Sequence, residues 1–216
     1  MSPRPLRRLL LNGMLFLGVG LILWVLVHPS YSRLLVSVSQ GVLSVIETDE
    51  KTSVRLQENS IVYVPVGLAT KEQKPIPAGK REVRDLHYNS VILFALILFS
   101  PGLGLKKRAA VLVAGLALLF LTQVVTVLVQ VKFFYALQLG EYSRLHYGPW
   151  SRNIYAFLKQ FFELIGRFAF PFAIWMLFTY KETIEYLTGT PTDEKPRKKK
   201  KRQEVRGVFP LWRKTV

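Results

Sequence analysis

Four long apolar runs, separated by short basic clusters, constrain this chain more than any other feature of its sequence. The runs cover residues 9–27, 91–105, 109–131 and 168–180. A bilayer core of about 30 Å is crossed by about 20 helical residues, so the runs can enter a membrane, although the second is short for a full crossing. If all four cross, three basic clusters lie on the same side, at Arg4, Arg7 and Arg8, at residues 106–108 and at residues 195–202.

That side is predicted to be the cytoplasm, because cytoplasmic loops of membrane proteins are enriched in lysine and arginine. The sequence therefore predicts an all-α membrane protein with four transmembrane helices, both termini in the cytoplasm, and a small extracytoplasmic β-hairpin segment. Residues 9–27 exceed the usual apolar length of a signal peptide, and residues 28–32 make a poor cleavage site. We therefore expect an uncleaved anchor.

The charge of the chain narrows the class of partner. Its 216 residues carry a net charge of +16, which in a soluble protein would suggest nucleic-acid binding. Here most of the excess lies in clusters that membrane topology requires, so anionic lipid is the expected partner and nucleic acid is not. The absence of cysteine excludes disulfides, thiolate metal sites and a cysteine nucleophile. The chain shows none of the common hydrolase, zinc-protease or nucleotide-binding motifs, and we expect no cofactor.

The pattern divides the chain into four segments. Residues 1–28 are the expected transmembrane anchor, and residues 29–86 form an extracytoplasmic segment with an amphipathic helix and a β-hairpin. Residues 87–187 form a membrane region of three helices with an aromatic outer loop, and residues 188–216 form a disordered basic cytoplasmic tail. The tail offers a candidate lipid-binding run at Lys198, Lys199, Lys200, Lys201 and Arg202.

Two patterns follow one another in the extracytoplasmic segment. Apolar side chains recur at three and four residues over 30–46, which predicts an amphipathic helix that continues from the anchor or lies on the outer leaflet. Residues 52–57 alternate, residues 58–60 favour a turn, and residues 61–64 are β-branched or aromatic, which predicts a β-hairpin. So small a segment is expected to lean on the membrane helices or on another protein.

Proline shapes two further segments. Three prolines between residues 65 and 77 predict a loop or an edge strand after the hairpin. Near the C-terminal side, Ser151 is the expected N-cap of a helix that runs from about Arg152 into the last span. Pro171 is expected to kink that helix.

The richest mixture of polar groups lies at the mouth of the second span, at Arg84, Asp85, His87 and Asn89. One hypothesis is a binding or catalytic rim in which Asp85 and His87 act as an acid–base pair. The other is structural, with interface charges and an asparagine that anchors neighbouring helices by hydrogen bonds. We take all four as candidate partner-binding residues.

Gln123, Thr126 and Gln130 form a polar stripe on one face of the third span. Such a stripe is costly against lipid and is expected to face another helix, as packing contacts rather than as a transport path. On the outer loop, Glu141 and Arg144 could grip a charged group of a partner or could be ordinary surface charges. These residues complete the set of candidate partner-binding residues.

Three histidines, His28, His87 and His146, fall on the outer side if the topology holds. They lie far apart in the sequence, and none has a second ligand at the third or fourth following residue. We therefore expect interfacial side chains and no metal site.

The order of these features resembles that of the small membrane proteins that accompany exosortases, in particular the exosortase H-associated type. The resemblance covers about residues 5–187: an anchor, a β-containing outer segment, the polar-to-apolar entry at residues 87–90, two close spans joined by a basic turn, and an aromatic stretch into a last span. Exosortases rely on a Cys, an Arg and a His, so the lack of cysteine excludes that catalytic role here. The resemblance implies a non-catalytic accessory to a protein-sorting transpeptidase of the bacterial inner membrane.

The leading hypothesis is therefore an accessory or assembly protein that binds another membrane protein, such as an exosortase-type enzyme. The alternative is a membrane-embedded enzyme or carrier that acts at the outer leaflet through the rim at residues 84–89. A third possibility is a lipid-sensing or scaffold protein that works through its basic tail.

Overall fold

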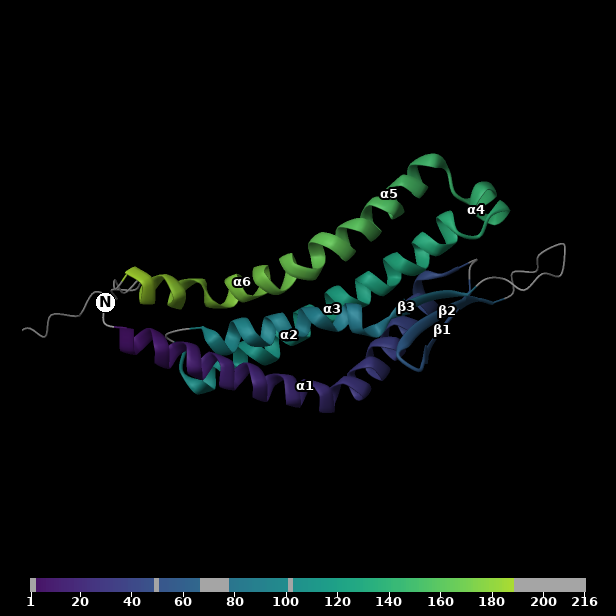
Figure 1. The fold of residues 1–216 in the computed structure, drawn as a ribbon. Coiled ribbons are helices and arrows are strands. Elements are labelled where there is room, and N and C mark those ends of the chain that lie inside the picture. The colour runs from purple at the N-terminus through teal and green to yellow at the C-terminus, as the bar shows by residue number, and fades with distance from the viewer. Residues whose placement is uncertain (1–2, 49–50, 67–77, 101–102, 189–216) are drawn as a thin grey trace, which may run out of the picture.

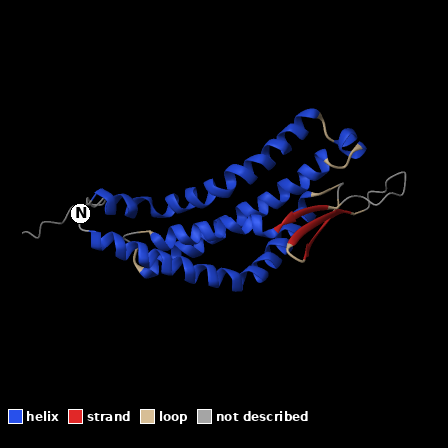
Figure 2. Ribbon diagram, viewed as in Figure 1, coloured by secondary structure: helices blue, strands red, loops and turns tan. Residues whose placement is uncertain are grey.

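The computed structural model describes residues 3–48, 51–66, 78–100 and 103–188. It is mostly helical, with one small sheet at one end of an elongated bundle (Figures 1 and 2). In chain order the elements are α1 (Pro3–Ile46), β1 (Thr52–Gln57), β2 (Ser60–Pro65), β3 (Gly79–Glu82), α2 (Val83–Phe99), α3 (Leu105–Leu137), α4 (Glu141–His146), α5 (Pro149–Gln160), the π-helix η1 (Phe161–Ile165) and α6 (Gly166–Thr188).

The long helices of the described chain pack with alternating direction: α1, α2, α3 and the rod formed by α5, η1 and α6 (Figure 1). The start of α1, the turn between α2 and α3 and the end of α6 lie at one end of the bundle. The sheet and α4 lie at the other. An ion pair between Lys107 and Glu182 joins α3 to α6 at the first end. Residues 4–8 and 106–108, two of the predicted basic clusters, thus share one end, and residues 195–202 lie outside the described residues.

Two helical segments in the described chain are long and apolar enough to cross a membrane, Leu105–Leu137 and the rod at Pro149–Tyr186, with mean hydropathies of 2.5 and 1.6. The prediction of four spans therefore holds for two. The 17 residues of α2 extend about 26 Å at 1.5 Å per residue, which is short of a full hydrocarbon core. Part of the predicted first span, residues 9–27, lies among residues whose side chains the structure does not describe.

The predicted hairpin is confirmed, and it belongs to a larger sheet. β1 and β2 pair in antiparallel register from Thr52↔Pro65 to Gln57↔Ser60, and Glu58 in the turn has a φ of 53°. β3 adds to the far side of β2, so the strand order is β1-β2-β3. Of the two alternatives for the chain after the hairpin, the edge strand holds at Gly79–Glu82. Most of the proline-rich stretch, residues 67–77, lies outside the described residues.

The inner face of the sheet shares one core with α1, α2 and α3. Val54, Ile61 and Tyr63 of the sheet pack with Leu35 and Leu43 of α1 and with Val127, Val131 and Phe134 of α3. A second cluster joins α2, α3 and α6 further along the bundle through Leu93, Ile97, Leu119 and Ile174. The sheet therefore leans on the helices, as its small size requires.

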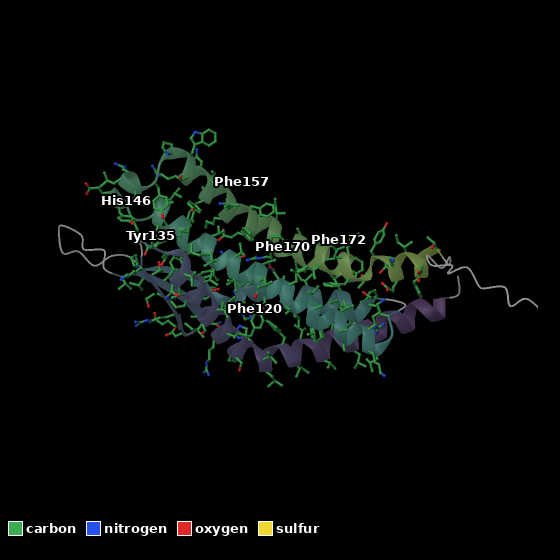
Figure 3. The ribbon with its side chains drawn as sticks, turned by 180° about the vertical axis from the view of Figure 1, so that it is seen from behind. Phe120, Tyr135, His146, Phe157, Phe170 and Phe172 are labelled. Carbon is green, nitrogen blue, oxygen red and sulfur yellow. The ribbon has the colours of Figure 1, made fainter. Side chains whose placement is uncertain are left out.

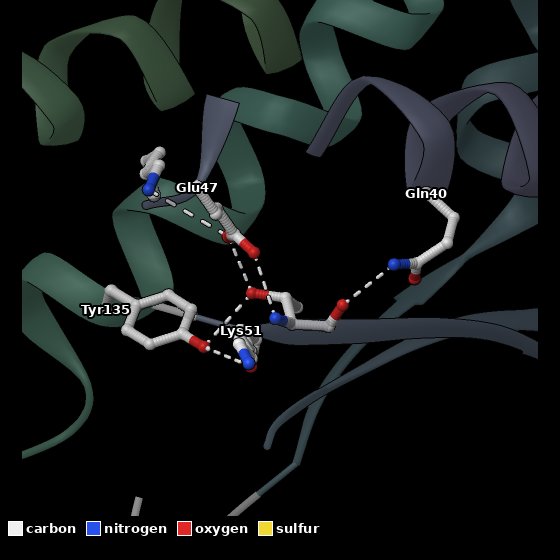
Figure 4. A network of polar contacts seen from close by, with 6 residues as sticks. Gln40, Glu47, Lys51 and Tyr135 are labelled. Carbon is white, nitrogen blue, oxygen red and sulfur yellow. Dashed lines mark hydrogen bonds and ion pairs between the residues drawn. The ribbon is translucent and has the colours of Figure 1, made fainter. Parts of the chain in front are cut away.

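Side chains of α1 and α3 also hold the edge strand β1 (Figure 4). The Gln40 amide accepts a hydrogen bond from the Val54 backbone N–H at 2.6 Å and donates one to the Thr52 carbonyl at 3.0 Å. Glu47 accepts from both the backbone N–H and the hydroxyl of Thr52, at 2.9 and 2.7 Å. The Tyr135 hydroxyl lies 3.0 Å from the Thr52 hydroxyl. These groups take the place of a neighbouring strand, so the edge is not open for pairing.

Two helix predictions have different outcomes. The amphipathic helix at residues 30–46 is confirmed as the continuation of α1, which contains Pro29 and bends part-way along its length (Figure 1). The N-cap prediction at Ser151 is wrong, because α5 begins at Pro149 with Gly148 as its N-cap. Proline suits the first turn of a helix, since its φ is preset and it needs no hydrogen-bond acceptor there.

Replacing Gln40 by alanine tests the closure of the sheet edge. The Gln40→Ala change leaves a buried N–H and a buried C=O of β1 without partners, at about 1–3 kcal/mol for each unsatisfied group. We expect the free energy of unfolding to fall by about 2 kcal/mol. The β1 amides should also exchange hydrogen for deuterium faster, as followed by mass spectrometry. Gln160→Ala, at an exposed position at the end of α5, is the matched control. Unchanged β1 exchange in the Gln40 variant would contradict this account.

Candidate functional site

A partly buried carboxylate on the π-helix gathers polar groups from three other elements at the sheet end of the bundle. Glu163 Oε1 accepts hydrogen bonds from Arg81 Nη1 of β3 at 2.6 Å and from Gln130 Nε2 of α3 at 2.8 Å. Its Oε2 lies 3.0 Å from Lys159 Nζ of α5. The side chain of Glu163 is 27% exposed and that of Arg81 is 10% exposed. We call these four residues the Glu163 cluster.

A cavity of about 360 Å³ opens beside the Glu163 cluster. Its walls are mainly polar and include both charge signs, from Lys80, Arg81, Glu82, Asp85, Gln130, Gln138, Lys159 and Glu163. Lys159 also lies 4.9 Å from the centre of the Phe133 ring, which adds a cation–π contact at the wall. We call this cavity the polar pocket. Its chemistry suits a small charged or strongly hydrogen-bonding group.

The β3 backbone reaches the pocket because of a glycine. Gly79 pairs with Tyr63 across the strands, and a Cβ at Gly79 would overlap the Tyr63 ring. The ring lies over the glycine, a cross-strand arrangement that only glycine allows. Burial raises the pKa of the Tyr63 phenol, although the nearby Arg81 acts in the opposite direction. Tyr63 therefore stays neutral at physiological pH and acts as a wall of the pocket.

The predicted rim residues contact different parts of the bundle. Asp85 Oδ1 lies 3.3 Å from Arg167 Nη2 of α6, and the Arg167 guanidinium lies 6.0 Å from the centre of the Tyr88 ring. Arg84 faces Glu82 at 3.8 Å with both side chains more than half exposed, so this pair adds about 1 kcal/mol at most. Asn89 is 8% exposed, and its Oδ1 is buried without a hydrogen-bond partner.

His87 lies on the side of α2 that faces α1. It is 2% exposed and sits among the rings of Trp24, His28 and Tyr31, with centroid distances of 5.2, 4.4 and 5.2 Å. Ser32 Oγ lies 3.5 Å from His87 Nε2. Asp85 and His87 thus have neighbours on different helices, α6 and α1, as expected for residues two apart on a helix. The structure does not join them as an acid–base pair.

The polar stripe of α3 faces other helices, as predicted. Gln123 is 1% exposed, accepts from the Tyr31 hydroxyl at 2.8 Å, and donates to the Leu86 carbonyl at 2.9 Å. Gln130 joins the Glu163 cluster. Thr126 is buried but donates to the Thr122 carbonyl of its own helix at 2.8 Å. Two of the three stripe residues therefore hold the bundle together.

The remaining candidates lie at the surface or outside the described chain. Glu141 and Arg144 are exposed on α4, near Leu145 and Trp150, which are 74% and 81% exposed. His146 stacks on Tyr142 at a centroid distance of 4.1 Å, far along the chain from the His28–His87 pair. Among the described residues no group of three or more His, Asp or Glu could hold a metal ion. The basic run at Lys198–Arg202 lies outside the described residues.

Glu163 and the π-helix were missed in the sequence analysis. One signal was available: Lys159, Glu163 and Arg167 are spaced by four residues, which places an acid between two bases on one helix face. No pattern in residues 161–165 predicted the π-helix. Such bulges occur frequently at functional sites, and this one carries the carboxylate around which the cluster forms.

A double-mutant cycle tests how strongly Arg81 and Glu163 are coupled. Arg81→Met and Glu163→Leu should each lower stability by about 3 kcal/mol, because each leaves a mostly buried charge without its main partner. The double variant should lose less stability than the two single variants together. We expect this difference, the coupling energy, to be about 2 kcal/mol when unfolding is titrated with detergent. Glu82→Leu with Arg84→Met is the matched exposed cycle, whose coupling should stay below about 1 kcal/mol. Equal couplings in both cycles would refute a structural role for the cluster.

A second comparison separates the members of the polar stripe. Gln123→Leu removes hydrogen bonds that reach α1 and α2, and we expect a loss of about 1–2 kcal/mol, since interhelical bonds in membranes are worth about 0.6 kcal/mol each and at most about 1.7. Thr126→Val removes only a bond within its own helix and should change stability by less than about 0.5 kcal/mol. Thermal unfolding in micelles measures both, and a reversed order would contradict the assignment.

Comparison with known proteins agrees with the resemblance. A family profile described as exosortase H-associated membrane protein matches residues 3–182, most of the chain. No curated protein and no solved structure matches this chain. The apolar segments at Leu105–Leu137 and Pro149–Tyr186 fit the membrane location in the family description. The chain therefore belongs to the family of exosortase H-associated membrane proteins.

Proposed function

We propose that this protein is a non-catalytic accessory protein of the bacterial cytoplasmic membrane that binds exosortase H. Family membership supports the proposal most directly, since the description of the family names that association. In the proposed topology α1, α2, α3 and the rod all cross the membrane, with both termini in the cytoplasm. Supporting this orientation, residues 4–8 and Lys106, Lys107 and Arg108 lie at the same end of the bundle (Figure 1). The basic tail would then rest on anionic lipid.

The corner formed by α4 and the start of α5 is the proposed contact with the partner. Trp150, Leu145 and Phe157 are 81%, 74% and 67% exposed, and Glu141 and Arg144 lie beside them. Figure 3 shows Phe157 on α5, between His146 of α4 and Phe170 of α6. Exposed tryptophan and arginine next to apolar side chains are typical of interface hot spots. Gln123 and Gln130 are less suited to bind a partner, because their hydrogen bonds are used inside the bundle.

An enzyme at the rim of residues 84–89 has less support. Asp85 pairs with Arg167 on one side of α2, whereas His87 is buried against α1 on the other. A reaction at the outer leaflet through these two groups would need them at one place.

Recovery of exosortase H from native membranes tests the proposal. With a C-terminal tag and a photo-cross-linking residue at position 153, an exposed position on α5, we expect one dominant adduct with exosortase H. Leu145→Ala with Trp150→Ala should weaken recovery about tenfold or more, as loss of a hot spot does. Tyr180→Ala, at a 55% exposed aromatic near the other end of the rod, is the control and should leave recovery unchanged.

The opposite result is equally informative. If the wild-type protein recovers only itself or lipid, the accessory role is refuted. If Asp85→Ala and His87→Ala abolish function while exosortase H recovery is intact, the rim enzyme replaces it.

A further inference from the structure

An open apolar groove runs between α2 and the rod on the membrane side of the polar pocket. Its volume is about 550 Å³, and Ile92 and Leu96 of α2 face Leu164, Phe168 and Phe172 across it. Leu164, Phe168 and Phe172 are 67%, 63% and 50% exposed. Near the middle of the rod, therefore, large apolar side chains line a groove that the bundle does not fill.

The groove and the polar pocket adjoin each other along α2 and the rod, which gives a path from polar to apolar walls. On the rod, Glu163 lines the pocket and the next residue, Leu164, lines the groove. On α2, Asp85 lines the pocket and Ile92 lines the groove, about 10 Å further along the helix axis. Asp85 of the pocket pairs with Arg167, which lies among the groove-lining residues of the rod in sequence. A molecule with a polar head and an apolar chain can therefore lie along this path.

The charges at the head of the path favour an anion. The pocket lining itself holds three bases, Lys80, Arg81 and Lys159, and three acids, Glu82, Asp85 and Glu163. Arg84 and Arg167, which pair with Glu82 and Asp85, give the pocket and its ion-pair partners an excess of two bases. Arg81 lines the pocket with only 10% of its side chain exposed. Its Nε is buried and has no hydrogen-bond partner, although Nη1 is bound to Glu163. An anionic group in the pocket would lie beside the Arg81 and Lys159 cations and would be attracted by their charge.

We propose that the polar pocket and the apolar groove together bind one anionic phospholipid, with its phosphate near Arg81 and Lys159 and an acyl chain between α2 and the rod. The bilayer supplies this ligand at high local concentration. A partner helix would fill the groove with apolar side chains but would bring no anion to the pocket. The proposal does not rest on the association with exosortase H.

Lipid binding to the purified full-length protein in mild detergent, followed by native mass spectrometry, tests the site. The probes are phosphatidylglycerol, phosphatidylcholine with the same acyl chains, and glycerol 3-phosphate as the head group alone. We expect phosphatidylglycerol to bind at least tenfold more tightly than either of the others.

Two variants divide the site into head and chain. Lys80→Gln with Lys159→Gln removes pocket charge while Arg81 and Gln130 still hold Glu163, and Ala169→Trp fills the groove, which Ala169 lines. Each should weaken phosphatidylglycerol binding about tenfold. Lys51→Gln with Lys106→Gln, and Ala114→Trp on α3, are matched controls at exposed positions away from both cavities. Melting temperatures confirm that all variants fold.

Three results would overturn the proposal. Equal binding of both phospholipids in all variants would mean unspecific annular lipid. Equal binding of glycerol 3-phosphate would mean a site for a free anion to which the groove adds nothing. If Ala169→Trp abolishes recovery of exosortase H and leaves lipid binding unchanged, the groove belongs to the partner protein instead.

Discussion

The side chain of Glu163 is the constraint around which the sheet end of this protein is organised. An acid in an apolar helix is costly to bury unless charged and hydrogen-bonding partners surround it. Here Arg81, Gln130 and Lys159 supply them from a strand and two helical segments. Because the partners come from separate elements, satisfying one carboxylate also fixes where β3, α3 and the rod meet. The polar pocket exists because these charged side chains converge there.

The sheet depends on the helices in a similar way, through polar rather than only apolar contacts. Three strands are too few to support a core, and β1 would be an open edge. Gln40 of α1 and Glu47, the residue that follows α1, bind backbone groups of β1, and Tyr135 of α3 closes the network from the other side. These side chains thus act as the missing strand at Thr52 and Val54, which explains why so short a β segment holds a defined shape.

Local patterns in the sequence predicted what local interactions determine. The hairpin at residues 52–65 could be predicted because alternation and turn residues lie within a few positions of each other. The inward face of Gln123 and Gln130 followed from helical spacing and the cost of amides in lipid. Ser151 was mispredicted as an N-cap because a side-chain oxygen was weighed above Gly148 and Pro149, whose backbone preferences start the helix earlier.

What could not be predicted depends on contacts distant in sequence. Arg81 and Glu163 are 82 residues apart, and β3 pairs with a strand across a proline-rich stretch that carries no strand pattern. His28 and His87 are distant in sequence, and their rings meet at a tilt because α1 and α2 run antiparallel. Of the four predicted spans two are long and apolar enough in the described chain, and the second falls short for a physical reason. Residues 91–105 are apolar, but the helix ends at Phe99, before the run does.

The position of the rod follows from the membrane as solvent. Between helices in lipid there is little hydrophobic driving force, so register depends on packing and on polar contacts. The rod is fixed at successive heights by Glu163 to Arg81, Arg167 to Asp85 and Glu182 to Lys107, and by the Trp175 indole N–H donating to Ser100 at 2.6 Å. Between the contacts at Glu163 and Trp175 the groove lies open. Polar contacts that set the register without closing the apolar faces leave room for a ligand from the bilayer, so the stability of the rod and the existence of the groove have the same cause.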